Sequence, residues 1–178
     1  MKKILGFDIS STTIGYSLIE FDKENIKIIE YGHLKPPSSE AGTLAFRALK
    51  ASKMLKDLFL RLNPDYVAFE DYANSFSKGR SSARTIIVLS VFNEMSAMTC
   101  LDTLGIEPIK YPAITIRSAL SKIKGEKITS KEEAFKFVCD NYPDFKLRYK
   151  KTKKIKDECF DEADAIAVCL TYIKKEIK

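Results

Sequence analysis

The stretch KKILGFDIS, residues 2–10, decides how the rest of the chain is interpreted. It is a short apolar run without helical periodicity, which is typical of a buried strand, and one carboxylate, Asp8, interrupts it. After a polar turn at residues 10–15 the chain resumes as a second strand over residues 16–21. A lone carboxylate on a core strand is costly unless it is paired or binds a ligand. On these residues alone, Asp8 fits an ordinary strand-end turn as well as a functional site.

The composition is typical of one soluble domain, which we expect to cover residues 1–178. Of the 178 residues, 45% are hydrophobic and 30% are charged. We find neither a secretory signal nor an apolar run near the roughly 20 residues that span a bilayer, so we expect a cytoplasmic protein without membrane contact. Four widely spaced cysteines indicate reduced thiols rather than a zinc site. Because His33 is the single histidine, we expect catalysis by carboxylates, lysines or hydroxyls.

Strand-like and helix-like patterns alternate along the chain, and short turns separate the first three strands. This order predicts an α/β fold, in which an antiparallel meander and two later, parallel strands form a mixed five-stranded sheet with helices on both faces. The helix over residues 81–104 is apolar on more than one side, so it is either central or shared with a partner subunit. The strands are expected over residues 2–10, 16–21, 25–34, 66–70 and 106–111, and the helices over residues 40–62, 81–104, 113–122, 130–141 and 158–175.

Isolated acids recur at the ends of the core elements. Glu70 ends the fourth strand, and Asp164 interrupts an otherwise apolar helix, with Asp161 three residues earlier on the same face. If strands one and four were neighbours below the start of this helix, these acids and Asp8 would meet. Divalent cations with oxygen ligands resolve such repulsion, and two of them about 4 Å apart serve phosphodiester cleavage. The alternative is that acids at a helix start complement its dipole, but this does not account for Asp164 or Glu70.

A basic segment precedes the last helix. Seven of the eleven residues 146–156 are Lys or Arg, with Tyr149 among them, and the whole chain has a net charge of +6. Such a run is usually a solvated loop. Beside an acidic cluster that holds metal, it also fits contacts with nucleic-acid phosphates.

In these motifs the chain resembles the RuvC-type Holliday junction resolvases, which have the RNase H-like fold. The segments GFDIS (6–10) and GYSLI (15–19) are similar to the family's first motif, and PDYVAFE (64–70) is similar to its second. DEADAIAV (161–168) resembles its closing acidic helix, and SKE (130–132) resembles the start of its lysine-bearing helix. The resemblance covers essentially the whole chain.

The resemblance implies a structure-selective, homodimeric endonuclease that resolves four-way junctions with two Mg²⁺ ions per active site, for which Mn²⁺ can substitute. The segment 71–80 and the long basic loop depart from the usual bacterial pattern, as in looser phage or poxvirus members, which would act in a host cytoplasm. The implied catalytic residues are Asp8, Glu70, Lys131, Asp161 and Asp164, of which the four acids would hold the metals. The expected DNA contacts are Tyr72, Phe76, Lys78, Arg80, Arg117, Lys150, Lys151, Lys153 and Lys154.

The dimer contact is expected on the helix over residues 81–104. A two-fold dimer would place two active sites in the symmetry that two opposed cuts require. Tyr72 and Phe76 would then lie near the two-fold axis, where they could stack on unpaired bases. The expected contact residues are Ile86, Val88, Leu89, Val91, Phe92, Met95 and Met98.

Other functions remain open at this point. Residues 8–15 also resemble the first phosphate loop of the actin, sugar-kinase and Hsp70 ATPases, which need a second such domain. A non-catalytic DNA-binding relative is a further alternative, against which the intact set of acids argues. Within the nucleases, flaps, three-way junctions and RNA–DNA hybrids are alternative substrates, because fold alone does not fix the substrate. Lys131 by itself could equally be a solvated lysine at a helix start.

Overall fold

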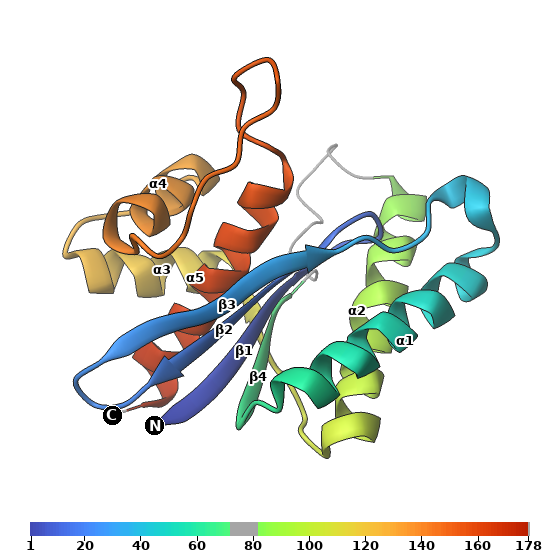
Figure 1. The fold of residues 1–178 in the computed structure, drawn as a ribbon, viewed down its shortest axis with the longest axis horizontal. Helices are drawn as coiled ribbons and strands as arrows, with labels where there is room; N and C mark the ends of the chain where they lie inside the picture. The colour runs from blue at the N-terminus through green and yellow to red at the C-terminus, as the bar shows by residue number, and fades with distance from the viewer. Residues whose placement is uncertain (72–81, 178) are drawn as a thin grey trace.

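The computed structural model describes residues 1–71 and 82–177, and in this part of the chain five strands form one sheet in the order β3-β2-β1-β4-β5 (Figure 1). Neighbouring strands β1, β2 and β3 are antiparallel, whereas β4 runs parallel to β1 and β5 runs parallel to β4. The predicted mixed sheet is therefore confirmed. The strands are β1 (Lys2–Ile9), β2 (Ile14–Phe21), β3 (Ile26–Leu34), β4 (Tyr66–Asp71) and β5 (Ile109–Pro112).

Strand β1 lies in the middle of the sheet, between β2 and β4. Leu5 faces Leu18 of β2 on one side and Val67 of β4 on the other, and all three side chains are buried. A strand that is covered on both faces has no solvated side, which is why its sequence is a continuous apolar run rather than an alternating one.

Helices cover both faces of the sheet, as the sequence predicted (Figure 1). On one side lie α1 (Leu44–Leu62) and α2 (Ala83–Leu104), and on the other lie α3 (Ala113–Lys124), α4 (Lys131–Asn141) and α5 (Glu158–Glu176). Each side has its own apolar core, one around Phe7 and Phe59 and the other around Ile4 and Ile166. The helix expected from residue 40 begins at Leu44, because Thr43 caps it and a short 3₁₀ turn, η1 (Ser39–Ala41), precedes it.

Helix α5 lies unusually close to the sheet. A Cβ atom placed on Gly15 of β2 would overlap the carbonyl oxygen of Asp161, and one on Gly6 of β1 would come 2.6 Å from that of Ala165. Backbone therefore packs directly against backbone at two points, and a side chain larger than hydrogen fits at neither glycine without a shift.

Helix α2 has one side buried in the core and one side exposed. It packs against α1, and Phe92 is fully buried in the core together with the polar residues Asn93 and Ser96. The other side is open, with Met98 71% exposed. By length and composition alone α2 could cross a membrane, and 28% of its most apolar window is buried inside the structure. We interpret it as a core helix with a second apolar face, because its buried side belongs to the sheet core.

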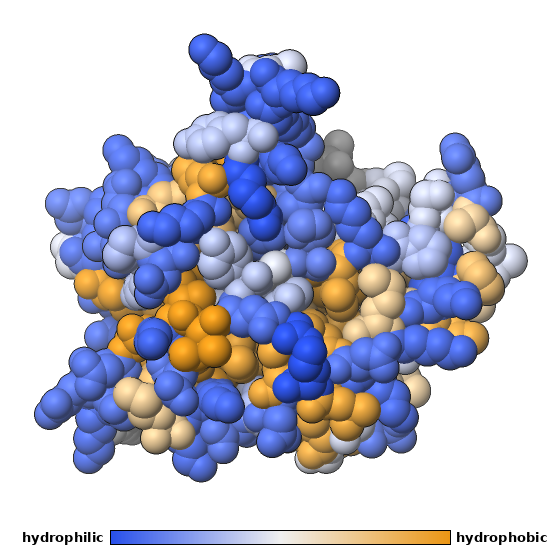
Figure 2. All heavy atoms as spheres, viewed as in Figure 1, coloured by the Kyte–Doolittle hydropathy of each residue, from blue (hydrophilic) through white to orange (hydrophobic). Residues whose placement is uncertain are grey.

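The basic loop before α5 is a projecting hairpin rather than an extended connection (Figure 1). Tyr149 and Ile155 form an antiparallel bridge, and the backbone N–H of Lys150 donates to the carbonyl of Lys154. Hydrophilic side chains cover this projection (Figure 2). We refer to residues 149–155 as the basic hairpin.

Candidate active site

Three carboxylates meet where β1, β4 and α5 come together. Asp8, Glu70 and Asp164 each offer an oxygen, and these oxygens all lie within 4.8 Å of one another. The sheet register explains this convergence: Phe7 pairs with Phe69, so Asp8 and Glu70 are the next residues along two adjacent parallel strands. Asp164 reaches them from the buried side of α5. We call these three residues the acid cluster.

Burial and mutual repulsion make the acid cluster hard to ionise. Burial, then the charges of Asp164 and Glu70, raise the pKa of Asp8 well above its usual value. Burial, followed by the charge of Asp164, raises the pKa of Glu70 to about 7. The folded chain therefore concentrates negative charge at a place where only a cation or protons can stabilise it.

Lys131 provides part of that positive charge. It is the first residue of α4, directly after a capping box formed by Ser130 and Glu133, and its ammonium group lies 2.5 Å from Oδ2 of Asp164. Burial lowers the pKa of Lys131, but the charges of Asp164 and Asp8 outweigh it and raise the pKa overall. The predicted lysine is thus held against the acid cluster, rather than pointing freely into solvent.

Asp161 lies beside the acid cluster but not within it. The prediction that four acids meet holds for three of them, because Asp161 is outside the set whose oxygens lie within 4.8 Å. Burial raises the pKa of Asp161 to about 6, while Lys131 lowers it and Asp164 raises it. Asp161 therefore shares the electrostatic field of the acid cluster from the preceding turn of α5.

The remaining predicted residues fall into three groups. Arg117 of α3 lines a small cavity of about 40 Å³ together with Glu70, Lys131 and Asp164, and its charge lowers the pKa of Glu70. The basic hairpin carries four exposed lysines away from the acid cluster: Lys150, Lys151, Lys153 and Lys154. Tyr72, Phe76, Lys78 and Arg80 lie outside the described residues.

The acid cluster fits a divalent metal ion by its chemistry. All of its ligand atoms are carboxylate oxygens, which hard cations such as Mg²⁺ and Mn²⁺ prefer. Oδ2 of Asp164 is buried and, apart from its charge contact with Lys131, has no hydrogen-bond partner of good geometry among residues 1–71 and 82–177. A buried carboxylate oxygen left in this state is suited to accept a further cation.

Glu162 was not predicted as a functional residue from the sequence. Unlike Asp164, it has a hydrogen-bonded partner for each of its oxygens. Its side chain is fully buried, and both of its oxygens accept hydrogen bonds of 2.5 Å from Nη2 of Arg148. Nδ1 of His33 on β3 lies 2.8 Å from Oε1 of the same carboxylate. Glu162 is therefore compensated from two sides and, through Arg148, fixes the base of the basic hairpin to α5. The only local signal was a second acid inside the run DEADA.

Known proteins are similar to this chain over nearly its whole length. No protein-family model matches it. A crossover junction endodeoxyribonuclease RuvC from Finegoldia magna is 25% identical over 173 residues, which cover 96% of this chain and 92% of the relative. The RuvC of Campylobacter jejuni is 29% identical over 170 residues, with coverages of 96% and 93%.

Solved structures share the fold. Thermus thermophilus RuvC in complex with Holliday junction substrate has a TM-score of 0.71 at 15% identity, and the match covers 98% of this chain and 94% of that one. The yeast mitochondrial Holliday junction resolvase Ydc2 has a TM-score of 0.66 at 11% identity, with coverages of 97% and 78%. The likeness thus extends through both helical layers and the sheet.

The raised pKa of Glu70 predicts how stability depends on pH when metal is removed. Between pH 4.5 and about 7 the folded chain keeps a proton on Glu70 that the unfolded chain has lost. This contribution to stability is therefore present below pH 4.5 and is lost as the pH rises through 7. We expect the free energy of unfolding in EDTA to fall by about 1–3 kcal/mol over this range. Urea unfolding at a series of pH values measures it.

Glu70→Gln should make this pH-dependent loss smaller but not abolish it, because the raised pKa values of Asp8, Asp161 and Asp164 also contribute. Glu107→Gln, in an exposed loop, should leave the loss unchanged. Addition of Mg²⁺ at pH 8 should restore stability to the wild-type chain but not to Glu70→Gln. Parallel pH profiles for wild type and Glu70→Gln would contradict the electrostatic account of the acid cluster.

The Glu162 contacts predict that Arg148→Met is destabilising. Removal of one partner of a buried ion pair leaves an uncompensated charge, which costs about 3–5 kcal/mol, and the partial exposure of Arg148 places the expected loss at about 2–3 kcal/mol. Lys150→Gln, which breaks only the exposed pair with Asp157, should cost less than about 1 kcal/mol. Urea unfolding compares the two. Arg148→Met combined with Glu162→Gln should recover part of the loss, and an unchanged midpoint for Arg148→Met would refute the anchoring role.

Proposed function

We propose that this chain, which is related over nearly its whole length to the RuvC-type Holliday junction resolvases, is a structure-selective DNA endonuclease. It resolves four-way junctions and other branched DNA by metal-dependent phosphodiester hydrolysis, as one nuclease domain over residues 1–178. The observation that carries this proposal is the acid cluster, Asp8, Glu70 and Asp164, with Lys131 against it at the carboxyl ends of two parallel strands.

We propose two Mg²⁺ ions per site, with Mn²⁺ able to substitute, held by the acid cluster and by Asp161 from the preceding helical turn. When bound, such a pair supplies an activated water and stabilises the leaving oxygen. The chain's own part is to hold the carboxylates in place on two strands and a helix. Lys131, already directed at Asp164, would place its positive charge beside the scissile phosphate and stabilise the charge that develops there.

DNA would approach the acid cluster between two basic elements. Arg117 adjoins Glu70 and Asp164, so its guanidinium can contact a phosphate close to the cut. The basic hairpin projects from the molecule and presents exposed lysines to a more distant part of the backbone. We further propose that Lys78 and Arg80 contact DNA, and that Tyr72 and Phe76 stack on unpaired bases at the branch point.

We propose that the chain acts as a homodimer through α2. Two opposed cuts need two active sites in two-fold symmetry. The open side of α2 carries exposed Ile87, Met98 and Leu101, an apolar surface that a second copy would cover. Phe92 is fully buried in the core of its own subunit, so its expected part in the contact is wrong. A cytoplasmic location agrees with a DNA-processing role.

In the part of the chain that the structure describes, no observation favours the ATPase alternative, whereas the carboxylates and Lys131 fit metal-assisted hydrolysis. Within the nucleases, the substrate is decided by an assay on four-way junctions, three-way junctions, flaps and RNA–DNA hybrids. We expect the four-way junction to be cut fastest.

The site assignment predicts that Asp164→Asn and Glu70→Gln lose cleavage but retain binding. Each change removes a metal ligand, so cleavage of a labelled four-way junction in Mg²⁺ should fall by about a hundredfold or more. Junction affinity should stay the same or improve, because negative charge beside DNA is removed. Glu132→Gln makes the same chemical change on the exposed first turn of α4 and should cleave normally. Full activity of Asp164→Asn would refute the assignment.

If the basic hairpin binds phosphates, replacement of its lysines should weaken the salt dependence of DNA binding. Each phosphate contact contributes about 0.9 to the slope of log affinity against log salt. If Lys150, Lys151, Lys153 and Lys154 all contact phosphates, their replacement by Gln should lower the slope by about 3 to 4 for every DNA sequence alike. Binding titrations at several salt concentrations measure the slope. An unchanged slope would mean that the basic hairpin is only a solvated loop.

If the dimer forms through α2, a single substitution that introduces a charge on this helix should separate the subunits. Met98→Glu should yield a monomer in light scattering at micromolar concentration, because it would bury an unpaired carboxylate in an apolar contact. Ile29→Glu, on the exposed side of β3, should leave the dimer intact. A wild-type chain that stays monomeric both alone and on a junction would contradict the proposal.

A further inference from the structure

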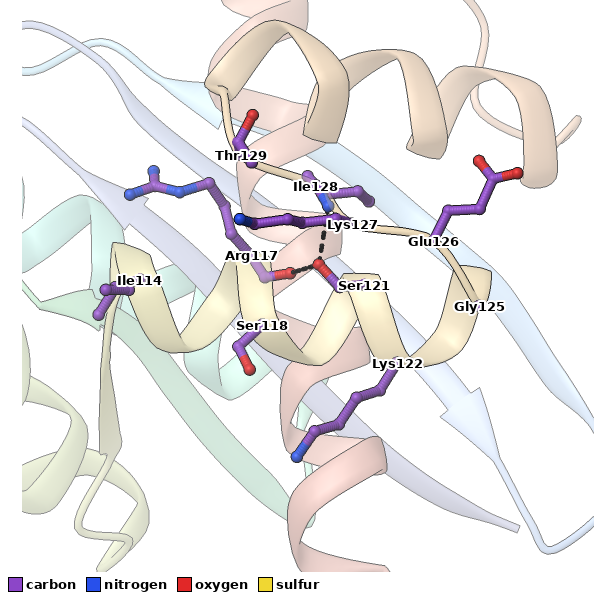
Figure 3. Close-up of a pocket in the computed structure, with 10 residues that line it drawn as sticks. All are labelled: Ile114, Arg117, Ser118, Ser121, Lys122, Gly125, Glu126, Lys127, Ile128 and Thr129. Atoms are coloured by element: carbon purple, nitrogen blue, oxygen red, sulfur yellow. Dashed lines mark hydrogen bonds between the residues drawn. The ribbon is translucent and has the colours of Figure 1, made fainter.

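A large open cavity adjoins the acid cluster on the side of α3. It has a volume of about 700 Å³ and is formed by α3 and the loop that joins α3 to α4 (Figure 3). Arg117 lines this cavity and also the small cavity that contains Glu70 and Asp164. The two spaces are therefore neighbours, with Arg117 between them.

A second open space lies beside the first, on the neighbouring side of α3. This second cavity, of about 560 Å³, shares Ile114, Ser118 and Lys122 with the first and ends at Lys174 and Lys175 of α5. Together the two cavities follow α3, whose twelve residues extend for about 18 Å. We call this continuous space the α3 path.

The α3 path is positively charged along its length. Arg117, Lys122, Lys127 and Lys174 border it, and among the described residues none of these four forms an ion pair with a carboxylate. The acid in the lining, Glu126, is paired with Lys124 at 2.8 Å instead. The path therefore presents cations that form no direct ion pair within the described parts of the chain, although Arg117 also acts on the nearby Glu70.

A hydrogen-bonded serine places two of these cations side by side. The hydroxyl of Ser121 donates to the carbonyl of Arg117 at 2.7 Å and accepts from the backbone N–H of Ile128 at 2.9 Å. These bonds tie the loop to α3, and the side chains of Arg117 and Lys127 extend in the same direction over the cavity (Figure 3). Two cations held alongside one another repel, and an anion between them would relieve that repulsion.

We propose that the α3 path binds the phosphodiester backbone of the DNA strand that leads away from the acid cluster. This inference rests on the proposed function and extends it to a second DNA contact, on α3 and the loop that follows it. A length of about 18 Å corresponds to about five nucleotides at 3.4 Å per nucleotide. Cations spread over this length suit a polyanion better than a single phosphate group, and their contacts would be independent of sequence.

The first test is the charge-neutral double variant Lys122→Gln/Lys127→Gln. Binding of a fluorescent four-way junction to the full-length chain is titrated in EDTA, where cleavage is prevented. We expect affinity to fall about tenfold at moderate salt, and the salt slope to fall by about 2, because two phosphate contacts are lost. Lys50→Gln/Lys53→Gln makes the same change of charge on α1, on the opposite face of the sheet, and should bind as wild type does.

The second test locates the contact on the DNA. Phosphates three to six nucleotides from the cut are replaced by uncharged methylphosphonates. This substrate should bind wild type more weakly than natural DNA does, but the Lys122→Gln/Lys127→Gln variant should bind both substrates equally. Equal weakening of wild type and variant by methylphosphonates would mean that the lysines contact DNA elsewhere, and would overturn the inference.

The outcomes separate this inference from the proposed function. If the double variant binds and cleaves junctions as wild type does, with an unchanged salt slope, the α3 path is not a DNA site, while the nuclease assignment stands. If the wild-type chain neither binds nor cleaves branched DNA, the proposed function fails, and this inference fails with it. Because both lysines are exposed, we expect the double variant to fold as wild type does. Circular dichroism and the urea midpoint check this.

Discussion

The mutual repulsion of Asp8, Glu70 and Asp164 is the constraint on which the rest of the structure depends. Three carboxylates within 4.8 Å would separate if the chain allowed it. The register of β1 against β4 fixes two of them, and the buried side of α5 fixes the third. Apolar packing on both faces of the sheet supplies the free energy that holds them together, and Lys131 offsets only part of the repulsion. The fold thus maintains an arrangement that is unfavourable by itself.

Two acids on one helix, two residues apart, show how environment separates structural from functional carboxylates. Glu162 is fully buried and bonded to Arg148 and His33, so it is satisfied within the chain. Asp164 is almost as buried, but within the described parts of the chain one of its oxygens has only a charge contact, with Lys131. A satisfied acid stabilises the fold, whereas an incompletely satisfied one can accept a cation. This difference makes Asp164, rather than Glu162, the candidate metal ligand.

The order of the elements and the acid cluster could be predicted from the sequence because they leave local signals. A strand covered on both faces is a continuous apolar run, and an acid at its end is conspicuous. The features that could not be predicted depend on distant residues. Glu162 lies against His33, which is 129 positions away in the sequence. Phe92 is buried in the core, but it belongs to a helix with apolar residues on more than one side, so the sequence did not show which side is buried. Asp161 lies outside the acid cluster because the orientation of α5 about its axis is set by packing, which spacing alone does not reveal.

The contacts of Gly6 and Gly15 with the backbone of α5 have a consequence for how this protein can change over evolutionary time. Because main chain meets main chain there, the height of the acid-bearing helix above the sheet does not depend on which apolar side chains fill the remaining space. The opposite face, where Phe7 packs between Phe59 and Phe69, can be rebuilt with other side chains while the carboxylates keep their positions. A larger side chain at either glycine would therefore displace the acid-bearing helix, whereas a change in the opposite layer would not act on that helix directly.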